Sequence, residues 1–320
     1  MRLISFLRDW MLPIAMVVGA VAYLVYSHIG TFDPVRPYVN EAVSYIQPLL
    51  IFMMLFLSFC RVKISDLRPC RWQAWLLLIQ VLSFSLLAVA TMLIPKNADY
   101  RVLIEGAMLC LICPTATSAA VVVSKLNGSA ANVITYTILI NLMVAVIIPL
   151  IVPLVHPQAG VSFITAFLLI IGKVFPLLLC PLIAALLVRY LLPKVHAALL
   201  KYPDLPFYLW AIALALAIAM TVKTIVHTHL AFGYQAGLAV ISLACCFLQF
   251  YLGRKIGGNY DDSVTAGQAL GQKNTILAIW MGYTFFTPIT AIAGGFYSVW
   301  HNLANSYQLY KHKNDVNAGK

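Results

Sequence analysis

Long apolar runs separated by short polar breaks fill the chain from end to end. A helix needs about 20 mostly apolar residues to cross a hydrocarbon layer about 30 Å thick. On this measure the pattern predicts ten membrane-spanning helices, near residues 11–27, 41–59, 73–94, 102–125, 131–154, 174–192, 206–225, 235–253, 263–284 and 286–309. These spans use nearly the whole length, so we expect an all-α polytopic membrane protein without a sizeable soluble domain.

Two apolar stretches need separate interpretation. Residues 161–172 form a short run that ends at Lys173, and we interpret them as an interfacial segment; an eleventh span is the alternative. Arg2 and Arg8 precede the first apolar run, as in a signal peptide, but no small-residue cleavage site follows them. We therefore expect the first span to be retained.

Composition supports the membrane interpretation. The chain is 62% hydrophobic and 10% charged, with a mean hydropathy of +0.91, whereas a soluble domain carries about 25% charged residues. The net charge of +11 is scattered singly between apolar runs, unlike the basic patches that bind nucleic acids. The cysteines lie in or beside apolar segments without the second ligand pair of a zinc site, so we expect packing roles for Cys60, Cys70, Cys110, Cys113, Cys180, Cys245 and Cys246.

Basic residues predict the orientation, because cytoplasmic loops carry an excess of Lys and Arg. With the N-terminus inside, the fifteen inner residues are Arg2, Arg8, Arg61, Lys63, Arg68, Arg71, Lys125, Arg189, Lys194, Lys201, Arg254, Lys255, Lys311, Lys313 and Lys320. The five outer ones are Arg36, Lys96, Arg101, Lys173 and Lys223. We therefore expect a multi-pass protein of the cell (inner) membrane with both termini in the cytoplasm. An eleventh span would break this alternation.

The two halves of the chain have corresponding breaks. Five spans followed by five more enter the membrane from opposite sides, which is the inverted-repeat plan of many secondary transporters. The repeats would cover residues 1–160 and 161–310, followed by a cytoplasmic tail, 311–320. Pro114 interrupts the fourth span and Gly271 the ninth, so both should unwind near the membrane centre and expose backbone groups for a transport site. Two harmless kinks are the alternative.

Lys273 lies beside the second break, well inside a span, with apolar sequence on both sides. Burying a lysine there costs at least about 3 kcal/mol on insertion scales. It needs a carboxylate, several carbonyls, water or an anionic ligand, or it loses its proton. A structural pair with Glu105 is the alternative. Amide and hydroxyl side chains on this span and on neighbouring spans could serve the ammonium or a ligand; they are Gln80, Gln268, Gln272, Asn274, Thr115, Thr117, Ser118, Thr137 and Asn141.

Four segments together resemble the bile acid:sodium symporter family over nearly the full length. They are residues 56–67, the segment from Cys113-Pro114 onward, the segment 269–274 that reads Ala-Leu-Gly-Gln-Lys-Asn where the family has Glu-x-Gly-x-Gln-Asn, and residues 296–303. The resemblance implies a panel of spans 1, 2, 6 and 7 and a core of spans 3, 4, 5, 8, 9 and 10. It implies transport of an organic anion, bound where spans 4 and 9 cross, usually with two sodium ions. By position, Thr117, Asn274 and His301 match substrate-contacting residues, and Asn302 follows in the same motif.

The departures from the family concern the sodium ligands. The shared acidic ligand aligns with Ala269, the Ser-Asn pair of the first site with Ala119 and Ala120, and a further serine with Val133, which leaves only Thr137. In the second site Gln80 matches, but the family's glutamine is Lys273. We therefore expect no sodium at either site and no other cofactor or metal. The hypothesis is that the Lys273 ammonium, bridging to Gln80, replaces the second sodium ion.

Three alternatives remain at this stage. Lys273 could release and regain a proton during the cycle, which would make the carrier proton-coupled. The fold could also serve a membrane sensor or binding protein that does not transport. A membrane enzyme would need a nucleophile with its base, paired carboxylates or a metal set at mid-membrane, and the sequence offers none of these, so we expect no enzyme.

Overall fold

The computed structural model describes residues 11–29, 34–61, 65, 67–157, 160–202, 205–228 and 231–317, and nearly all of them are helical. The helices of the first half are α2 (Met11–His28), α3 (Arg36–Cys60), α4 (Arg71–Met92), α5 (Arg101–Ile112), α6 (Ala119–Lys125) and α7 (Ala130–Val155). Those of the second half are α8 (Phe163–Leu178), α9 (Cys180–Leu191), α10 (Pro193–Leu200), α11 (Leu205–His227), α12 (Phe232–Gly258), α13 (Ser263–Gly271), α14 (Thr275–Phe285) and α15 (Ala291–Asn317). The all-α prediction is confirmed.

Six helical segments of the described residues are long and apolar enough to cross a membrane. They are Arg36–Cys60, Arg71–Met92, Ala130–Val155, Phe163–Leu191, Tyr208–His227 and Phe232–Gly258. Pro13–His28 and Thr275–Phe285 are shorter apolar helices. A helix, or a pair of helices, lies at each of the ten predicted spans, so the chain is a multi-pass membrane protein, while the ten-span inverted repeat stays a prediction.

Residues 161–172 are not separate from the span predicted to begin at residue 174, as their interpretation as an interfacial segment assumed. They lie largely in α8, whose first turn is capped by the Ser162 hydroxyl as it accepts from the Thr165 amide at 3.2 Å. α8 continues past Leu179 into α9 as one apolar segment. Two prolines suggested the start of a new span there. Pro176 lies inside α8. Pro181 lies in the first turn of α9, a position where a proline costs little. At the other end of the chain, α15 extends to Asn317, so residues 311–317 of the predicted tail are helical.

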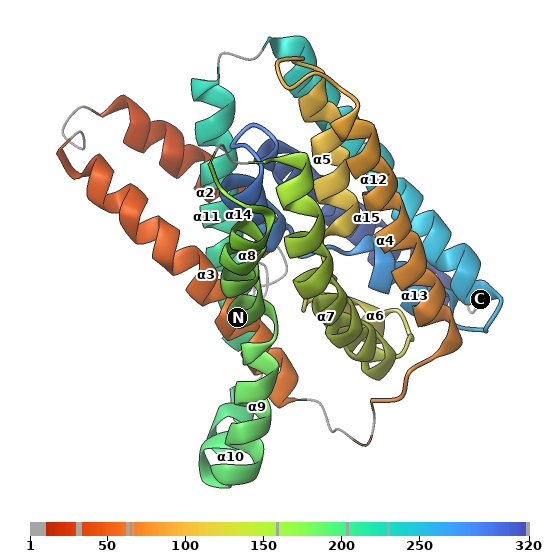
Figure 1. The fold of residues 1–320 in the computed structure, drawn as a ribbon. Coiled ribbons are helices and arrows are strands. Elements are labelled where there is room, and N and C mark those ends of the chain that lie inside the picture. Colours follow the sequence, from red (N-terminus) through yellow and green to blue (C-terminus); the bar gives the residue numbers. More distant parts are fainter. Residues whose placement is uncertain are drawn as a thin grey trace.

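The helices form two groups that meet along a few helices. α2 packs on α11, and α3 packs on both α9 and α11. α12 packs on α5, α13 and α15, and α4 packs on α5 and α7. Figure 1 shows α2 and α3 on the side of the molecule away from α12. Contacts of α7 with α8, and of α14 with α3 and α11, join the groups.

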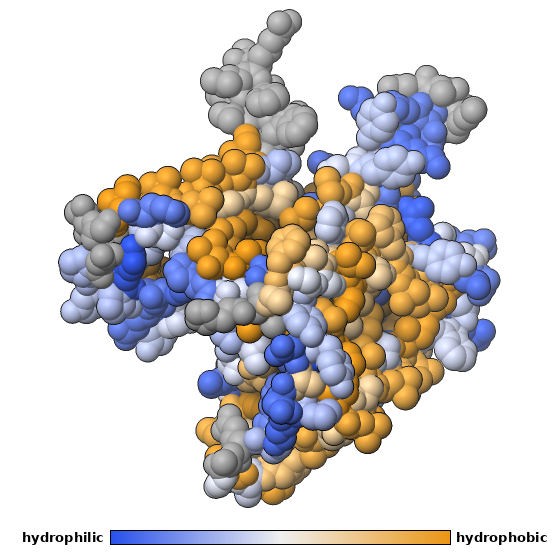
Figure 2. Space-filling view, turned by 90° about the horizontal axis from the view of Figure 1, so that it is seen from above, coloured by the Kyte–Doolittle hydropathy of each residue, from blue (hydrophilic) through white to orange (hydrophobic). Residues whose placement is uncertain are grey.

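The surface has the character of a lipid-facing protein. Large apolar side chains such as Leu86, Phe232 and Leu93 are well exposed, and Figure 2 shows apolar residues over much of the visible face. The interior also contains apolar side chains, with one cluster centred on Trp72, Tyr136 and the helices around them. Apolar side chains inside and outside are what a lipid solvent requires.

Candidate functional site

The two broken spans cross in the interior of the second group of helices. α5 ends at Ile112 and α6 begins at Ala119, while α13 ends at Gly271 and α14 begins at Thr275. Pro114 cannot donate a backbone hydrogen bond, which explains the first break. A Cβ at Gly271 would lie 2.4 Å from the ring of Phe250, so close packing against α12 requires glycine at the second. The predicted unwinding at both breaks is confirmed.

The unwound segments pair with each other. The Ala116 amide donates to the Gln272 carbonyl at 2.9 Å, and the Asn274 amide donates to the Pro114 carbonyl at 2.8 Å. These bonds make an antiparallel bridge in which Thr115 lies opposite Lys273. The backbone groups freed by the breaks are therefore partly used in the crossing itself, and fewer remain for a ligand than the sequence suggested.

The Lys273 side chain is buried and unpaired. It is 1% exposed, and its Nζ meets no hydrogen-bond partner among the described residues. The titratable side chains within electrostatic reach are four thiols, those of Cys110, Cys113, Cys245 and Cys246 on α5, the segment after it and α12. These thiols are free and form no disulfide, in keeping with the expected packing roles. The ammonium group thus lies in surroundings that offer little to stabilise a charge.

The alternative that pairs Lys273 with Glu105 is wrong. Glu105 Oε1 accepts from Arg101 Nε at 2.8 Å and lies 3.2 Å from His156 Nε2. Its other oxygen, Oε2, accepts from the Thr290 hydroxyl at 3.2 Å. This carboxylate is fully engaged at the end of α5 that lies far from the crossing.

Gln80 does not bridge to Lys273 either. Its Nε2 donates to the carbonyls of Ile112 and Cys113 at 3.1 and 3.0 Å, and its Oε1 accepts from the Tyr136 hydroxyl at 2.8 Å. The amide caps the open end of α5, so that both of its polar atoms are used. The hypothesis of a lysine-glutamine bridge is wrong in this respect.

Gln272 and Asn274 point away from Lys273. The backbone at Gln272 is extended, with φ −90° and ψ 97°, and successive side chains of an extended segment alternate in direction. Gln272 Nε2 donates to the Ser118 hydroxyl at 2.7 Å, and Asn274 Oδ1 accepts from the Leu277 amide at 3.2 Å, which caps α14. The amides that are neighbours of Lys273 in sequence therefore lie on the other face of the crossing.

The remaining predicted residues occupy varied positions. Thr137 donates to the Val133 carbonyl of its own helix at 2.8 Å, and Asn302 Nδ2 donates to the Ser298 carbonyl at 2.7 Å. Thr117 is partly buried in the bend before α6. Several other predicted site residues have buried polar atoms without a hydrogen-bond partner among the described residues. These atoms are Asn141 Nδ2, Gln268 Oε1, Gln272 Oε1, and both ring nitrogens of His301.

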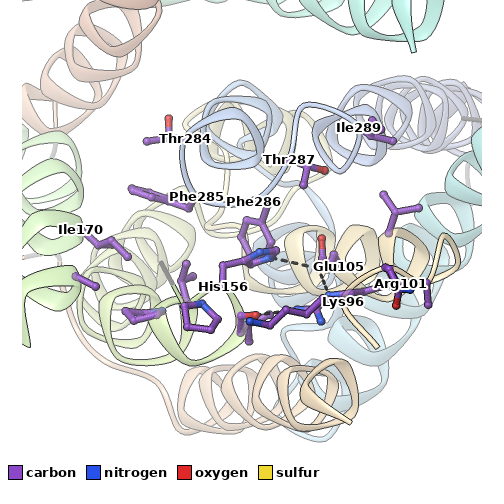
Figure 3. A pocket seen from close by; sticks show the side chains of 18 of the residues that line it. Lys96, Arg101, Glu105, His156, Ile170, Thr284, Phe285, Phe286, Thr287 and Ile289 are labelled. Carbon is purple, nitrogen blue, oxygen red and sulfur yellow. Dashed lines mark hydrogen bonds and ion pairs between the residues drawn. The ribbon is translucent and has the colours of Figure 1, made fainter. Parts of the chain in front are cut away.

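A pocket of about 840 Å³ opens at the end of the molecule formed by the loop between α4 and α5. Figure 3 shows Glu105 joined to Arg101 and His156 on its floor, with Lys96 beside them. Lys173 and Ile170 line it from α8, while Phe286 packs edge-on against the His156 ring with centroids 5.4 Å apart. Sequence reasoning missed this site, although the spacing of Arg101 and Glu105 by four residues on one helix was a usable signal.

The family of the chain follows from a comparison of its sequence with protein-family models. Residues 9–296 match the model of the SBF-like CPA transporter family. The chain belongs to this transporter family. The search of curated proteins finds no match to the chain. The predicted resemblance to bile acid:sodium symporters is thereby confirmed, and a member of a transporter family is expected to move a solute rather than to catalyse a reaction.

Four of the positions that the resemblance aligns with the family's sodium ligands carry apolar side chains in this SBF-like protein. Ala119, Val133 and Ala269 are fully buried in the main apolar cluster, and Ala120 packs against it. Sodium is a hard cation that takes oxygen ligands, and these four side chains offer none. Nor do the described residues contain a group of three or more metal-binding side chains.

Proposed function

We propose that this SBF-like protein is a secondary carrier that moves a small organic anion across the cell membrane by alternating access, without sodium. The observation that carries the proposal is the buried, unpaired amino group of Lys273 at the crossing of two broken helices. Paired broken helices near the membrane centre mark the binding sites of many secondary transporters. A positive charge fixed at the crossing favours an anionic substrate, or it replaces the charge that a bound sodium ion supplies in sodium-coupled transporters.

The packing of the helices supports the two moving parts that alternating access requires. The first group, α2, α3, α8, α9 and α11, would be the panel, and the second, which holds the crossing, would be the core. In the ten-span, inverted-repeat arrangement that we propose, the pairs α5/α6 and α13/α14 are the fourth and ninth spans. Both parts line the pocket, because α8 contributes Lys173 and α5 contributes Arg101 and Glu105.

The pocket supports an outward-open state and an anionic substrate. In the orientation that the basic residues predict, the loop between α4 and α5 is outside and both termini are in the cytoplasm. Four cationic or protonatable side chains, Lys96, Arg101, His156 and Lys173, line the pocket against two acidic ones, Asp99 and Glu105. Apolar side chains, including Leu169, Ile170 and Phe286, complete the lining. An anion with an apolar body, such as a bile-acid-like, sulfated or carboxylate compound, suits this mixture.

The test is a ligand screen followed by flux measurement. Small carboxylates and sulfated compounds are first screened for thermal stabilisation of the purified protein, with and without sodium. Uptake of a stabilising compound into proteoliposomes then distinguishes a carrier from a sensor, which would bind without flux. Sodium-independent uptake that is lost in Lys273→Met and kept in Thr135→Val supports the proposal. A strict requirement for sodium would overturn it.

Proton coupling by Lys273 is the second candidate, and one observation favours it. The Nζ has no carboxylate partner, and desolvation favours the neutral form of an unpaired amine. A proton lost and regained there during the cycle would drive uptake from a pH gradient. Uptake that does not respond to an imposed pH gradient excludes this candidate and leaves the fixed-charge carrier.

A further inference from the structure

A row of polar side chains runs between the second broken span and α15. The Thr275 hydroxyl donates to the Ser298 hydroxyl at 3.1 Å, and Gln268 Nε2 donates to Asn305 Oδ1 at 3.0 Å. The two pairs fit one antiparallel register, since each step forward along the broken span matches a step back along α15. On α15, His301 lies between Ser298 and Asn305, on the same face of the helix as both. We call these side chains, with Gln308 below them, the polar ladder.

The middle of the polar ladder has unsatisfied polar atoms. Both ring nitrogens of His301 meet no hydrogen-bond partner among the described residues, and neither do Gln268 Oε1 and Asn305 Nδ2. His301 is 2% exposed and Asn305 5% exposed. Buried polar groups of proteins are paired in more than about nine cases out of ten, either with protein atoms or with water. Four such atoms, on three neighbouring side chains of α13 and α15, therefore call for a ligand.

The chemistry of these atoms identifies the ligand as water. An anion would need donors only, and a metal ion would need acceptors only. The ladder presents both, since the Gln268 amide oxygen accepts, the Asn305 amide donates, and a neutral imidazole has one nitrogen of each kind. If the oxygen and the nitrogen of both the Gln268 and the Asn305 side-chain amides are interchanged, the unpaired atoms of these two residues are still one donor and one acceptor. A neutral molecule that donates and accepts, and that makes about three hydrogen bonds when buried, fits this set.

The polar ladder joins two helices whose backbones lie apart. α15 packs closely on α12 and α14, but the backbones of α13 and α15 make few close contacts. Long amide side chains span the distance between them instead. At one end of the ladder Gln308, only partly buried, accepts from Gln268 Nε2 at 3.1 Å and from the exposed Arg254 at 2.6 Å. The row thus runs from the buried crossing to the end of the molecule where α12 and α13 are joined.

We propose that the polar ladder holds a file of water molecules that connects His301 with the solvent at the Arg254 end of the molecule. Through this file an imidazole nitrogen of His301 accepts a proton from hydronium and returns it to water. The proposed orientation makes that side the cytoplasm. The water file itself does not depend on transport, whereas its use in coupling rests on the proposed carrier function.

The surroundings of His301 leave water as the main support for its protonated form. The titratable and charged groups on α15 and on the helices packed against it are Tyr297, Tyr307, Tyr310, Lys311, His312, Lys313 and Asp315 on α15 itself, Arg101, Glu105 and Cys110 on α5, Tyr234, Cys245, Cys246, Tyr251, Arg254 and Lys255 on α12, Tyr283 on α14, Tyr208, Lys223 and His227 on α11, and Lys125 on α6. Tyr297 lies edge-on to the His301 ring at 5.8 Å, and its hydroxyl donates to the Gly271 carbonyl. Among the described residues no carboxylate forms an ion pair with His301.

Hydrogen-deuterium exchange at the imidazole C2 position, followed by mass spectrometry over a range of pH, tests the water file without any substrate. The purified full chain is used, and the partly exposed His312 is the internal reference. We expect His301 to exchange within about tenfold of that reference, with a sigmoidal pH profile. A dry, buried histidine exchanges only when the helices open. The exchange rate at His301 would then be lower than that at His312 by about a hundredfold or more. That slow, pH-independent exchange would overturn the proposal.

Two variants locate the path. Asn305→Leu replaces a polar member of the ladder with an apolar side chain of similar size, and Gln308→Leu does the same at its solvent end. Both should slow exchange at His301 by about tenfold or more and leave His312 unchanged, because the water file is interrupted. Thr135→Val, which removes a buried hydroxyl bonded to its own helix, is the matched control. Equal exchange in all three folded variants would show that water reaches His301 by another route and would contradict the proposed path. If the proteoliposome uptake test of the proposed carrier function failed, the exchange result at His301 would still stand.

Discussion

At the scale of single residues, the unusual feature is a lysine that the fold buries without a partner. Its removal should stabilise the protein while it destroys function. Methionine has a similar length and no charge, so Lys273→Met should raise the free energy of unfolding by about 1–3 kcal/mol, as the replacement of buried charges by apolar groups often does. Thermal denaturation in detergent and proteoliposome uptake are the measurements. A lower melting temperature would show that the ammonium has a stabilising partner in the folded protein.

Gln80 supports the crossing from outside it. Its amide caps two carbonyls at the end of α5 and accepts from the Tyr136 hydroxyl. Gln80→Leu leaves three buried polar groups unpaired, and each costs about 1–3 kcal/mol. We expect a clear fall in the melting temperature of the purified protein. Ser83→Ala on the same helix, which removes a hydroxyl bonded to the Gln80 carbonyl at the partly buried surface, should change it little; equal effects would contradict the capping role.

The sequence identified Lys273 as the residue to explain, because a charge inside an apolar run is visible without a structure. It did not identify the neighbours. Gln272 and Asn274 adjoin Lys273 in the chain and were expected around it, but the extended backbone at Gln272 turns them to the other face. The partners of Gln80 come from α5 and α7, far away in sequence. Side-chain direction at a helix break depends on dihedral angles that a hydropathy pattern does not contain.

At the scale of the elements, the second break depends on close packing. The space for a Cβ at Gly271 is filled by the ring of Phe250, 2.4 Å away. Gly271→Ala should therefore destabilise the protein by about 1–3 kcal/mol, the usual cost of overpacking, and Phe250→Leu in the same chain should restore part of the loss. Thermal denaturation measures both. Gly258→Ala is the control, because open space surrounds that position at the end of α12. An unaffected Gly271→Ala variant would show that the break does not depend on this contact.

Glu105 ties three elements together at the other end of α5. It holds Arg101 of its own helix, His156 at the end of α7, and Thr290 before α15. Glu105→Gln leaves the buried Arg101 without its charge partner, a change that costs about 3–5 kcal/mol. We expect a large fall in melting temperature, against no more than a small one for Glu41→Gln on the exposed surface of α3. Similar stability of the two variants would contradict a structural role for the network.

Most helices could be predicted from the sequence, since apolar length and polar breaks determine them directly. Both interruptions were also visible, at Pro114 and Gly271. The exception is α8, where prolines suggested a boundary that the helix does not have. The pocket was out of reach for a different reason. Its walls come from α5, α7, α8 and the segment after α14, and only the packing of these elements brings Lys96, His156 and Lys173 together.

At the scale of the whole molecule, the proposed transport cycle and orientation make one joint prediction about access. The pocket lies at the end formed by the loop between α4 and α5, and the proposed orientation puts the end of α15 on the opposite side of the membrane. In right-side-out vesicles, an impermeant maleimide should therefore label Ala166→Cys, which lines the pocket on α8, and not Asn314→Cys near the end of α15. The unmodified chain, with its seven buried or partly buried cysteines, gives the background.

A transported anion should slow the labelling of Ala166→Cys, because it fills the pocket or shifts the population toward the state that opens inward. Such a shift requires the anion to bind the two states with different affinity. A permeant maleimide should label both positions. If the impermeant reagent labelled Asn314→Cys and not Ala166→Cys, the orientation of the protein would be the reverse of the one predicted. An Ala166→Cys that neither reagent reaches would show that the pocket is closed in the membrane, and alternating access would then have to begin from the other side.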